Sequence, residues 1–192
     1  RRQRQMCIRD REQSGITIGG SAGAAVEGNR TLELKGTFGT GDFQNVTFTR
    51  FDEINIAQEG ASATIYALTD SPALTKTGAG TLALGYAGNT LAHLTVEEGT
   101  LAFTGGATIG VNPNNATIVR VSEGASLALS GGTVNLHAQL NGAGTVTIGT
   151  ADTAGLVNIS NTGNTNFTGR LELVGNGVNM STNANWVAFG AG

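Results

Sequence analysis

Residues 77–85 read TGAGTLALG, and residues 141–149 repeat the pattern as NGAGTVTIG. Each copy has the triplet Gly-Ala-Gly and then an alternation of apolar residues with small or polar ones. Because successive side chains of a β-strand point to opposite faces, this alternation predicts short strands that bury one face. The recurrence of the whole unit predicts a repeat protein, in which each unit stacks on its neighbours.

A second recurring unit consists of Glu-Gly followed by an alternating strand, and it begins at Glu27, Glu59, Glu98 and Glu123. The copies are unevenly spaced. A β-solenoid tolerates this because a turn can bulge outward while its strands stay paired at about 4.8 Å. We therefore expect an all-β solenoid whose variation in length is confined to loops. Helices are not expected, because the apolar residues recur at every second position in short segments bounded by glycine.

The alternation also predicts which side chains form the core. In each strand, two apolar residues flank one residue that should face solvent. We expect the apolar residues to stack as ladders: Leu82 and Leu84, Leu101 and Phe103, Leu127 and Leu129, Val146 and Ile148, and Leu171 and Leu173. The residues expected to face solvent are Ala83, Ala102, Ala128, Thr147 and Glu172.

The composition agrees with many short strands joined by turns. Among the 192 residues, 30 are Gly, 2 are Pro and 5% are aromatic, so a large aromatic core is excluded. Gly and Asn accept the positive φ angles of tight turns. The single cysteine, Cys7, excludes an intramolecular disulfide and metal sites built on paired cysteines. No stretch approaches the ~20 apolar residues of a membrane-spanning helix.

The first residues differ from everything that follows. Residues 1–11 read RRQRQMCIRDR and resemble the translated sequencing-adaptor tail that occurs at the ends of open reading frames in metagenomic assemblies. We expect residues 1–12 to be a non-native, disordered tail, and residues 13–192 to be a solenoid segment cut at both ends. The alternative is a basic arm for nucleic acid or lipid headgroups. Without the tail, 6 basic residues face 12 acidic ones, which predicts repulsion from nucleic acid and anionic membranes.

Residues 74–84 read LTKTGAGTLAL and resemble the autotransporter-associated β-strand repeat, whose members read approximately LTKxGxGTLxL. The similarity continues through residues 88–101, and residues 164–169 are similar to the family's Asn-Thr-Phe/Tyr-Thr-Gly turn with one additional Asn. Residues 16–60 depart more strongly from the family. The resemblance implies a right-handed parallel β-helix, displayed outside a Gram-negative cell within a longer polypeptide whose membrane link would be a C-terminal barrel or anchor.

The acidic residues give little sign of catalysis. A polysaccharide hydrolase or lyase on a β-helix would need clustered acids. We interpret the acids of this chain as solvated turn or edge residues, because neighbours on a strand point to opposite faces. The hydrolase remains the alternative if two or more of the single aspartates lie within about 10 Å on one outer face. The residues concerned are the single Asp42, Asp52, Asp70 and Asp152, and the pairs Asp52–Glu53 and Glu97–Glu98.

Other candidate sites have simpler structural interpretations. His93 and His137 are isolated from any Ser or Cys motif that would suggest a relay, and we interpret them as exposed strand or turn residues. Residues 39–43 resemble a calcium-binding nonapeptide only faintly and have no tandem copy. Residues 78–80 lack the Gly-Lys-Ser/Thr that follows in a phosphate loop. We therefore expect no metal and no cofactor.

The Asn-rich segments and the single Trp leave open whether the chain binds a glycan. Residues 112–115 and 158–166 are rich in Asn and are expected to form amide ladders at coil corners, with glycan contact as the alternative. Trp186, near Phe189, could stack on a sugar, but a lone Trp is more often packed at a strand end. Together these patterns predict a structural or adhesive segment without catalysis. Its expected partners are a host or extracellular glycan or protein, or other copies paired through exposed β edges.

Overall fold

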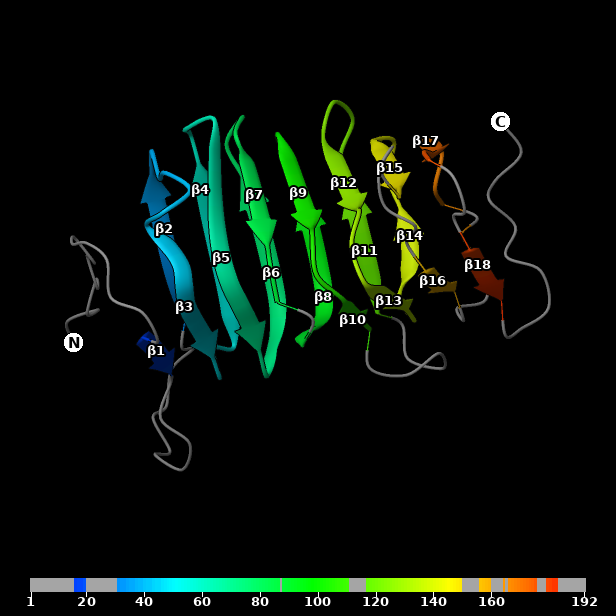
Figure 1. Ribbon diagram of the computed structural model, residues 1–192. Coiled ribbons are helices and arrows are strands. Elements are labelled where there is room, and N and C mark those ends of the chain that lie inside the picture. The colour runs from blue at the N-terminus through cyan, green and yellow to red at the C-terminus, as the bar shows by residue number, and fades with distance from the viewer. Residues whose placement is uncertain are drawn as a thin grey trace.

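The computed structural model describes residues 16–19, 31–86, 88–110, 117–149, 156–159, 164, 166–175 and 179–182. In these ranges the chain forms strands and turns but no helix. The strands stack along one axis (Figure 1), and every pairing between them is parallel. The prediction of an all-β parallel solenoid is therefore confirmed.

The described strands form two parallel sheets. Sheet A contains, in spatial order, β1 (Ile16–Gly19), β3 (Phe43–Thr49), β5 (Ser62–Thr69), β7 (Thr81–Leu84), β9 (Thr100–Phe103), β12 (Ser126–Leu129), β15 (Thr145–Ile148) and β17 (Arg170–Leu173). Sheet B contains β2 (Thr31–Gly36), β4 (Glu53–Gln58), β6 (Ser71–Thr77), β8 (Asn89–Val96), β10 (Ala107–Ile109), β13 (Thr133–Leu136), β16 (Leu156–Ile159) and β18 (Asn179–Thr182), with β11 (Ile118–Val121) and β14 (Gln139–Asn141) beside this path. The chain crosses from one sheet to the other in every turn of the coil.

The apolar ladders form in the predicted register. Leu101 pairs with Leu82 of the preceding turn and with Leu127 of the following turn. The same ladder continues to Val146 and Leu171. One apolar cluster joins the inward-facing residues of both sheets, so the core lies between them. It is mainly aliphatic. It also contains the single buried rings of Phe103 and Phe167. Near one end of the coil, Phe38, Phe43 and Phe48 stack edge to face with centroid separations of 5.1 and 5.9 Å.

One expected core residue is exposed. Leu173 has 58% of its surface in contact with solvent, although it pairs with the buried Ile148. Its strand β17 is the last in the order of sheet A among the described strands, so β15 covers it on one side only. The expected outward row is in place, because Ala83, Ala102 and Ala128 are in register. These alanines are half-buried, since the neighbouring turns shield their small side chains.

Irregular turn lengths are absorbed outside the ladders, as the sequence predicts. Residues 89–91 of β8 pair with β10, whereas residues 94–96 pair with β11. The face that is one strand in one turn is therefore divided into two shorter strands in the next. β13 and β14 follow the same division one turn later, pairing with β10 and β11. The two halves keep the register of β8, since Ile109 pairs with Leu91 and Val119 with Leu94.

Small residues are required where successive corners touch. A Cβ atom at Gly80 would lie 1.7 Å from the carbonyl oxygen of Gly60 in the preceding turn. Gly78 has a φ of +77°, and a Cβ there would lie 2.4 Å from the carbonyl oxygen of Gln58. The Gly-Ala-Gly triplet is thus explained by the close approach of backbones at the corner.

We expect Gly80→Ala to lower the free energy of unfolding by about 2–3 kcal/mol, because the added methyl group can be accommodated only by moving backbone. Chemical denaturation of the purified chain measures this change. Gly41→Ala is the matched control, since a Cβ at Gly41 meets nothing within 4 Å. Equal stabilities of the two variants would show that the corners are looser than described.

Candidate functional site

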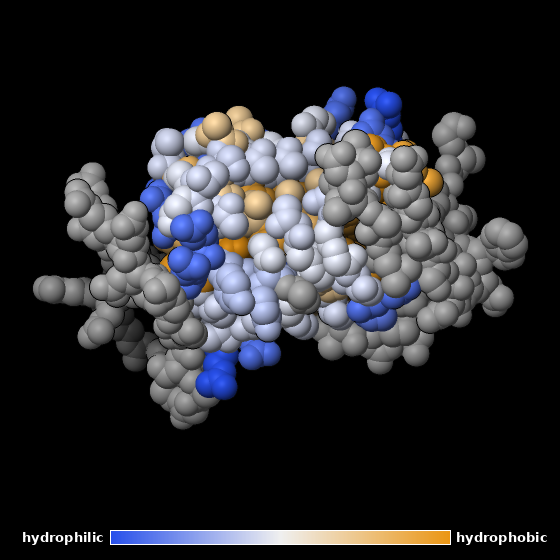
Figure 2. Space-filling model, viewed as in Figure 1, coloured by the Kyte–Doolittle hydropathy of each residue, from blue (hydrophilic) through white to orange (hydrophobic). Residues whose placement is uncertain are grey.

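Most of the sheet A strands are free of charged residues. The sheet A strands β3, β5, β7, β9, β12 and β15 contain no Asp, Glu, Lys or Arg. Charged residues lie on strands of sheet B, for example Glu33 and Lys35, which form an exposed ion pair of 3.2 Å on β2. They also lie on β17 at the end of sheet A, where Arg170 and Glu172 form an ion pair of 3.0 Å. The outer face of sheet A carries a row of hydroxyl groups in register: Ser62, Thr81, Thr100, Ser126 and Thr145. In Figure 2, the most hydrophilic residues lie in small groups toward the edges of the view, and the centre is paler.

Two tyrosines stand on this uncharged face. Tyr66 of β5 and Tyr86, in the turn after β7, stack with ring centroids 4.9 Å apart and an interplanar angle of 28°. Their exposed fractions are 42% and 41%. The buried Asn89 holds the turn beneath them, because its Oδ1 accepts from Leu68 N at 2.8 Å and its Nδ2 donates to Tyr86 O. The pair is therefore anchored to the coil while its rings remain accessible.

A β-bulge lies beside Tyr66. Phe43 pairs with Ile65, but the next paired residue of β3 is Thr47, which pairs with Ala67. Three residues of β3 thus oppose Tyr66 alone, and two of them, Gln44 and Asn45, are exposed. β-Bulges redirect side chains and often occur next to binding sites. Here the bulge places two amides beside an aromatic ring.

The sequence interpretation missed this tyrosine pair, although a signal was present. The chain contains 2 Tyr, and they are 20 residues apart, close to the 19 residues that separate the paired Ser62 and Thr81. Two residues one coil repeat apart lie on adjacent turns. The spacing therefore indicates that the two tyrosines lie side by side, once the length of the local repeat is known.

A lysine occupies an inward-facing position of the apolar ladder. Lys76 lies between Ile56 and Val96 in register and is fully buried. Its ammonium group donates to the carbonyl oxygens of Thr77 at 2.9 Å, Gly78 at 2.6 Å and Glu98 at 3.0 Å. The side chain thus joins the corner of its own turn to the corner of the next.

Burial lowers the pKa of the Lys76 ammonium below its ordinary value of 10.5, and the carboxylates of Glu59 and Glu98 partly oppose the shift. Lys76 was not among the predicted core residues, although it lies two positions after the buried Leu74; its three carbonyl partners come from corner geometry that the sequence does not show. We interpret Lys76 as a structural clamp, because all three of its hydrogen bonds go to backbone oxygens of corners.

The candidate acids fall on two opposite edges of the coil. Asp42 precedes β3, and its carboxylate accepts from Gly39 N at 2.9 Å within a turn. Asp52 and Asp70 lie at the other end of the sheet A strands, in corners of successive turns. The seven residues of β3 separate the two edges by roughly 20 Å. Asp42 is therefore not grouped with the other two.

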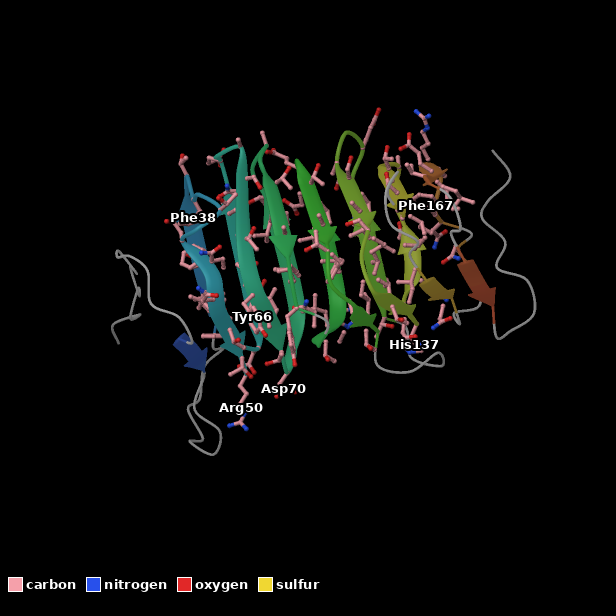
Figure 3. All side chains as sticks on the ribbon, viewed as in Figure 1. Phe38, Arg50, Tyr66, Asp70, His137 and Phe167 are labelled. Atoms are coloured by element: carbon pink, nitrogen blue, oxygen red, sulfur yellow. The ribbon has the colours of Figure 1, made fainter. Side chains whose placement is uncertain are left out.

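The edge with Asp52 and Asp70 also carries a basic residue. Arg50 and Asp70 both have left-handed backbone conformations, with φ of 60° and 52°. The amide of Arg50 donates to Thr69 O at 3.2 Å, which links the two corners. Figure 3 shows Arg50 and Asp70 close together at this edge, with Tyr66 nearby and His137 several strands away. Non-glycine residues rarely adopt this conformation, so the corner is locally strained.

The remaining candidates are dispersed. Glu97 and Glu98 are exposed in the turn after β8, which agrees with a solvated turn. His93 is exposed, and its Nδ1 accepts from Ile118 N at 3.4 Å. His137 is half-buried after β13. In the part of the chain that the structure describes, no group of three or more His, Cys, Asp or Glu could hold a metal ion.

Asparagine serves as a ladder and corner residue. Asn158 donates to Asn135 across neighbouring strands at 2.9 Å, and the buried Asn164 accepts from Leu140 N at 2.8 Å. Asn164 therefore satisfies a backbone amide as expected, whereas the Asn158–Asn135 pair lies between strands β16 and β13 and not at a corner. Some predictions lie outside the described residues: the tail with Cys7, the Glu-Gly unit at Glu27, Asp152, residues 112–115, Trp186 and Phe189.

The fold defines the chain as a parallel β-solenoid. Comparison with known proteins finds no matching family model, no matching curated protein and no matching solved structure. The autotransporter repeat therefore remains a prediction from the quoted motifs. Within the described ranges, no helix is long and apolar enough to span a membrane.

We expect Lys76→Met to lower the free energy of unfolding by about 1–3 kcal/mol at pH 7, because three carbonyl oxygens lose a donor while the apolar ladder is kept. The lowered pKa in the folded state means that the unfolded chain binds more protons at this position between the folded-state pKa and 10.5. The stability of the wild type relative to Lys76→Met should therefore rise as pH increases through that range.

Denaturation curves of both chains between pH 7 and 11 measure this difference. Lys35→Met is the control for the substitution itself, because Lys35 has 66% of its side chain exposed. A Lys76→Met chain at least as stable as the wild type at pH 7 would contradict this. It would mean that the free-energy cost of burying the Lys76 charge exceeds the stabilisation from its hydrogen bonds.

Proposed function

We propose that the chain is a non-enzymatic scaffold or adhesive segment of an autotransporter-type protein displayed on a Gram-negative bacterium. The observation that carries this proposal is the unbroken parallel stack of sheet A from β3 to β17, in which each turn pairs with its neighbours along the whole segment. Such a stack makes an extended, stiff body, and its binding surfaces repeat along its length.

The surface chemistry supports contact rather than catalysis. The outer face of sheet A from β5 to β12 is uncharged and rich in hydroxyl groups, which suits binding spread over several turns. Asp42 is engaged in its own turn, and Glu97 and Glu98 are solvated. The partner that fits such a surface is an extracellular or host glycan or protein.

One observation favours the alternative, a polysaccharide hydrolase or lyase. Asp52 and Asp70 share an edge with Arg50, and a pair of carboxylates with a cation is a combination that glycan-cleaving enzymes use. The corner is also strained, as functional sites often are. This alternative places the chemistry at the edge of sheet A rather than on its face.

We expect the purified chain to release no product from neutral or acidic polysaccharides, measured as reducing ends and as unsaturated uronates. Asp52→Asn/Asp70→Asn should behave in the same way, as should Asp42→Asn at the opposite edge. Product release that disappears in Asp52→Asn/Asp70→Asn but persists in Asp42→Asn, with circular dichroism unchanged, would establish the enzyme instead.

A further inference from the structure

We propose that the outer face of sheet A around Tyr66 and Tyr86 binds a chain of neutral sugars. This inference rests on the proposed adhesive function and names its ligand class. The site consists of the two stacked rings, the bulge amides of Gln44 and Asn45, and the hydroxyl row that continues across the neighbouring turns.

The aromatic pair provides the apolar part of the site. A pyranose ring presents C–H groups on its faces and hydroxyl groups around its rim. Tyrosine matches this because an apolar ring ends in a polar hydroxyl. The next turn passes beside Tyr86 with Gly105, whose amide donates to Leu84 O at 3.4 Å, so no side chain at that position covers the ring. Almost half of each tyrosine is therefore available to a ligand while Asn89 keeps the turn fixed.

The bulge provides the polar part. An amide side chain offers two donors and one acceptor with two lone pairs, which matches the mixed donors and acceptors of sugar hydroxyls. Gln44 and Asn45 are exposed directly opposite Tyr66, where regular pairing would have placed a single residue. Within the described ladders, this register shift coincides with the one exposed aromatic stack.

The absence of charge on these strands selects a neutral ligand. β3, β5, β7 and β9 contain no Asp, Glu, Lys or Arg, so an anionic polysaccharide would lose hydration without gaining an ionic partner. The edge that ends β3 and β5 carries Arg50 together with Asp52 and Asp70, so its net charge is negative and it disfavours an anionic ligand further. An extended ligand fits better than a single sugar because the uncharged face continues to β15.

Binding of the full chain to insoluble chitin and cellulose, and to soluble mixed-linkage glucan by affinity electrophoresis, tests the proposal. We expect binding to at least one of these neutral polymers and none to polygalacturonate or heparin. Tyr66→Ala/Tyr86→Ala should weaken the binding at least tenfold. Gln44→Ala/Asn45→Ala should weaken it about three- to tenfold through lost hydrogen bonds, with the stack intact.

Controls separate binding from folding. Tyr66→Phe/Tyr86→Phe keeps both rings and should retain most of the binding, whereas Ile118→Ala removes an exposed apolar side chain from sheet B and should change nothing. If Tyr66→Ala/Tyr86→Ala does not fold, the binding of Gln44→Ala/Asn45→Ala still tests the proposal. Binding that is absent, that prefers the charged polymers, or that survives both the tyrosine and the amide substitutions would overturn the proposal.

The same samples distinguish the proposed glycan ligand from the proposed non-enzymatic function. If the chain neither binds nor cleaves any of these polymers, the proposed glycan ligand is wrong, but the proposed scaffold function stands. If the chain binds a polymer through Tyr66 and Tyr86 and also cleaves it, the binding site is correct, but the proposed non-enzymatic function is wrong. A protein ligand would be indicated if a cell-surface protein, and no neutral glycan, competes for this face.

Discussion

Each turn of this solenoid takes its backbone hydrogen bonds from the turns before and after it, and most other features follow from that parallel pairing. Because paired strands are about 4.8 Å apart, the side chains of equivalent residues in successive turns must pack directly against one another. Inward positions become ladders of aliphatic residues such as Leu82, Leu101 and Leu127. At the corner between β6 and β7, the backbone of the preceding turn leaves no room for a Cβ atom, which explains Gly80. Where the inward ladder contains Lys76 instead, the same closeness brings three corner carbonyls within reach of its ammonium group.

Much of the fold could be predicted because alternation and repetition are local and periodic. The register of Leu84 with Phe103 follows from the same alternation of apolar and small residues in both strands. Other features depend on what lies next in space. Leu173 has the pattern of a core residue but is exposed, because pattern does not show how many turns cover a strand. Alternation places Lys76 inside, yet only the corner geometry shows how its charge is compensated. The division of β8 between β10 and β11 could be expected as a loop variation but not located.

The candidate site was harder to predict for the same reason. Sequence patterns directed attention to acids and histidines, which the structure places in separate turns or along one strained edge. The tyrosine pair has no motif, and it becomes visible only when residues 20 apart are known to lie on adjacent turns. The uncharged surface of sheet A from β3 to β15 also becomes visible only when strands are assigned to sheets. Both observations agree with a surface that binds by extended contact, while the core and corners supply stiffness.

The central claim is the in-register stacking of successive turns, and methyl NOE spectroscopy of the chain labelled at leucine tests it directly. The account predicts cross-peaks from Leu101 to both Leu82 and Leu127. It predicts none between Leu82 and Leu127, which are two turns, or roughly 9.6 Å, apart. Cross-peaks from Leu101 to neither residue, or a direct Leu82 to Leu127 contact, would contradict the solenoid described here.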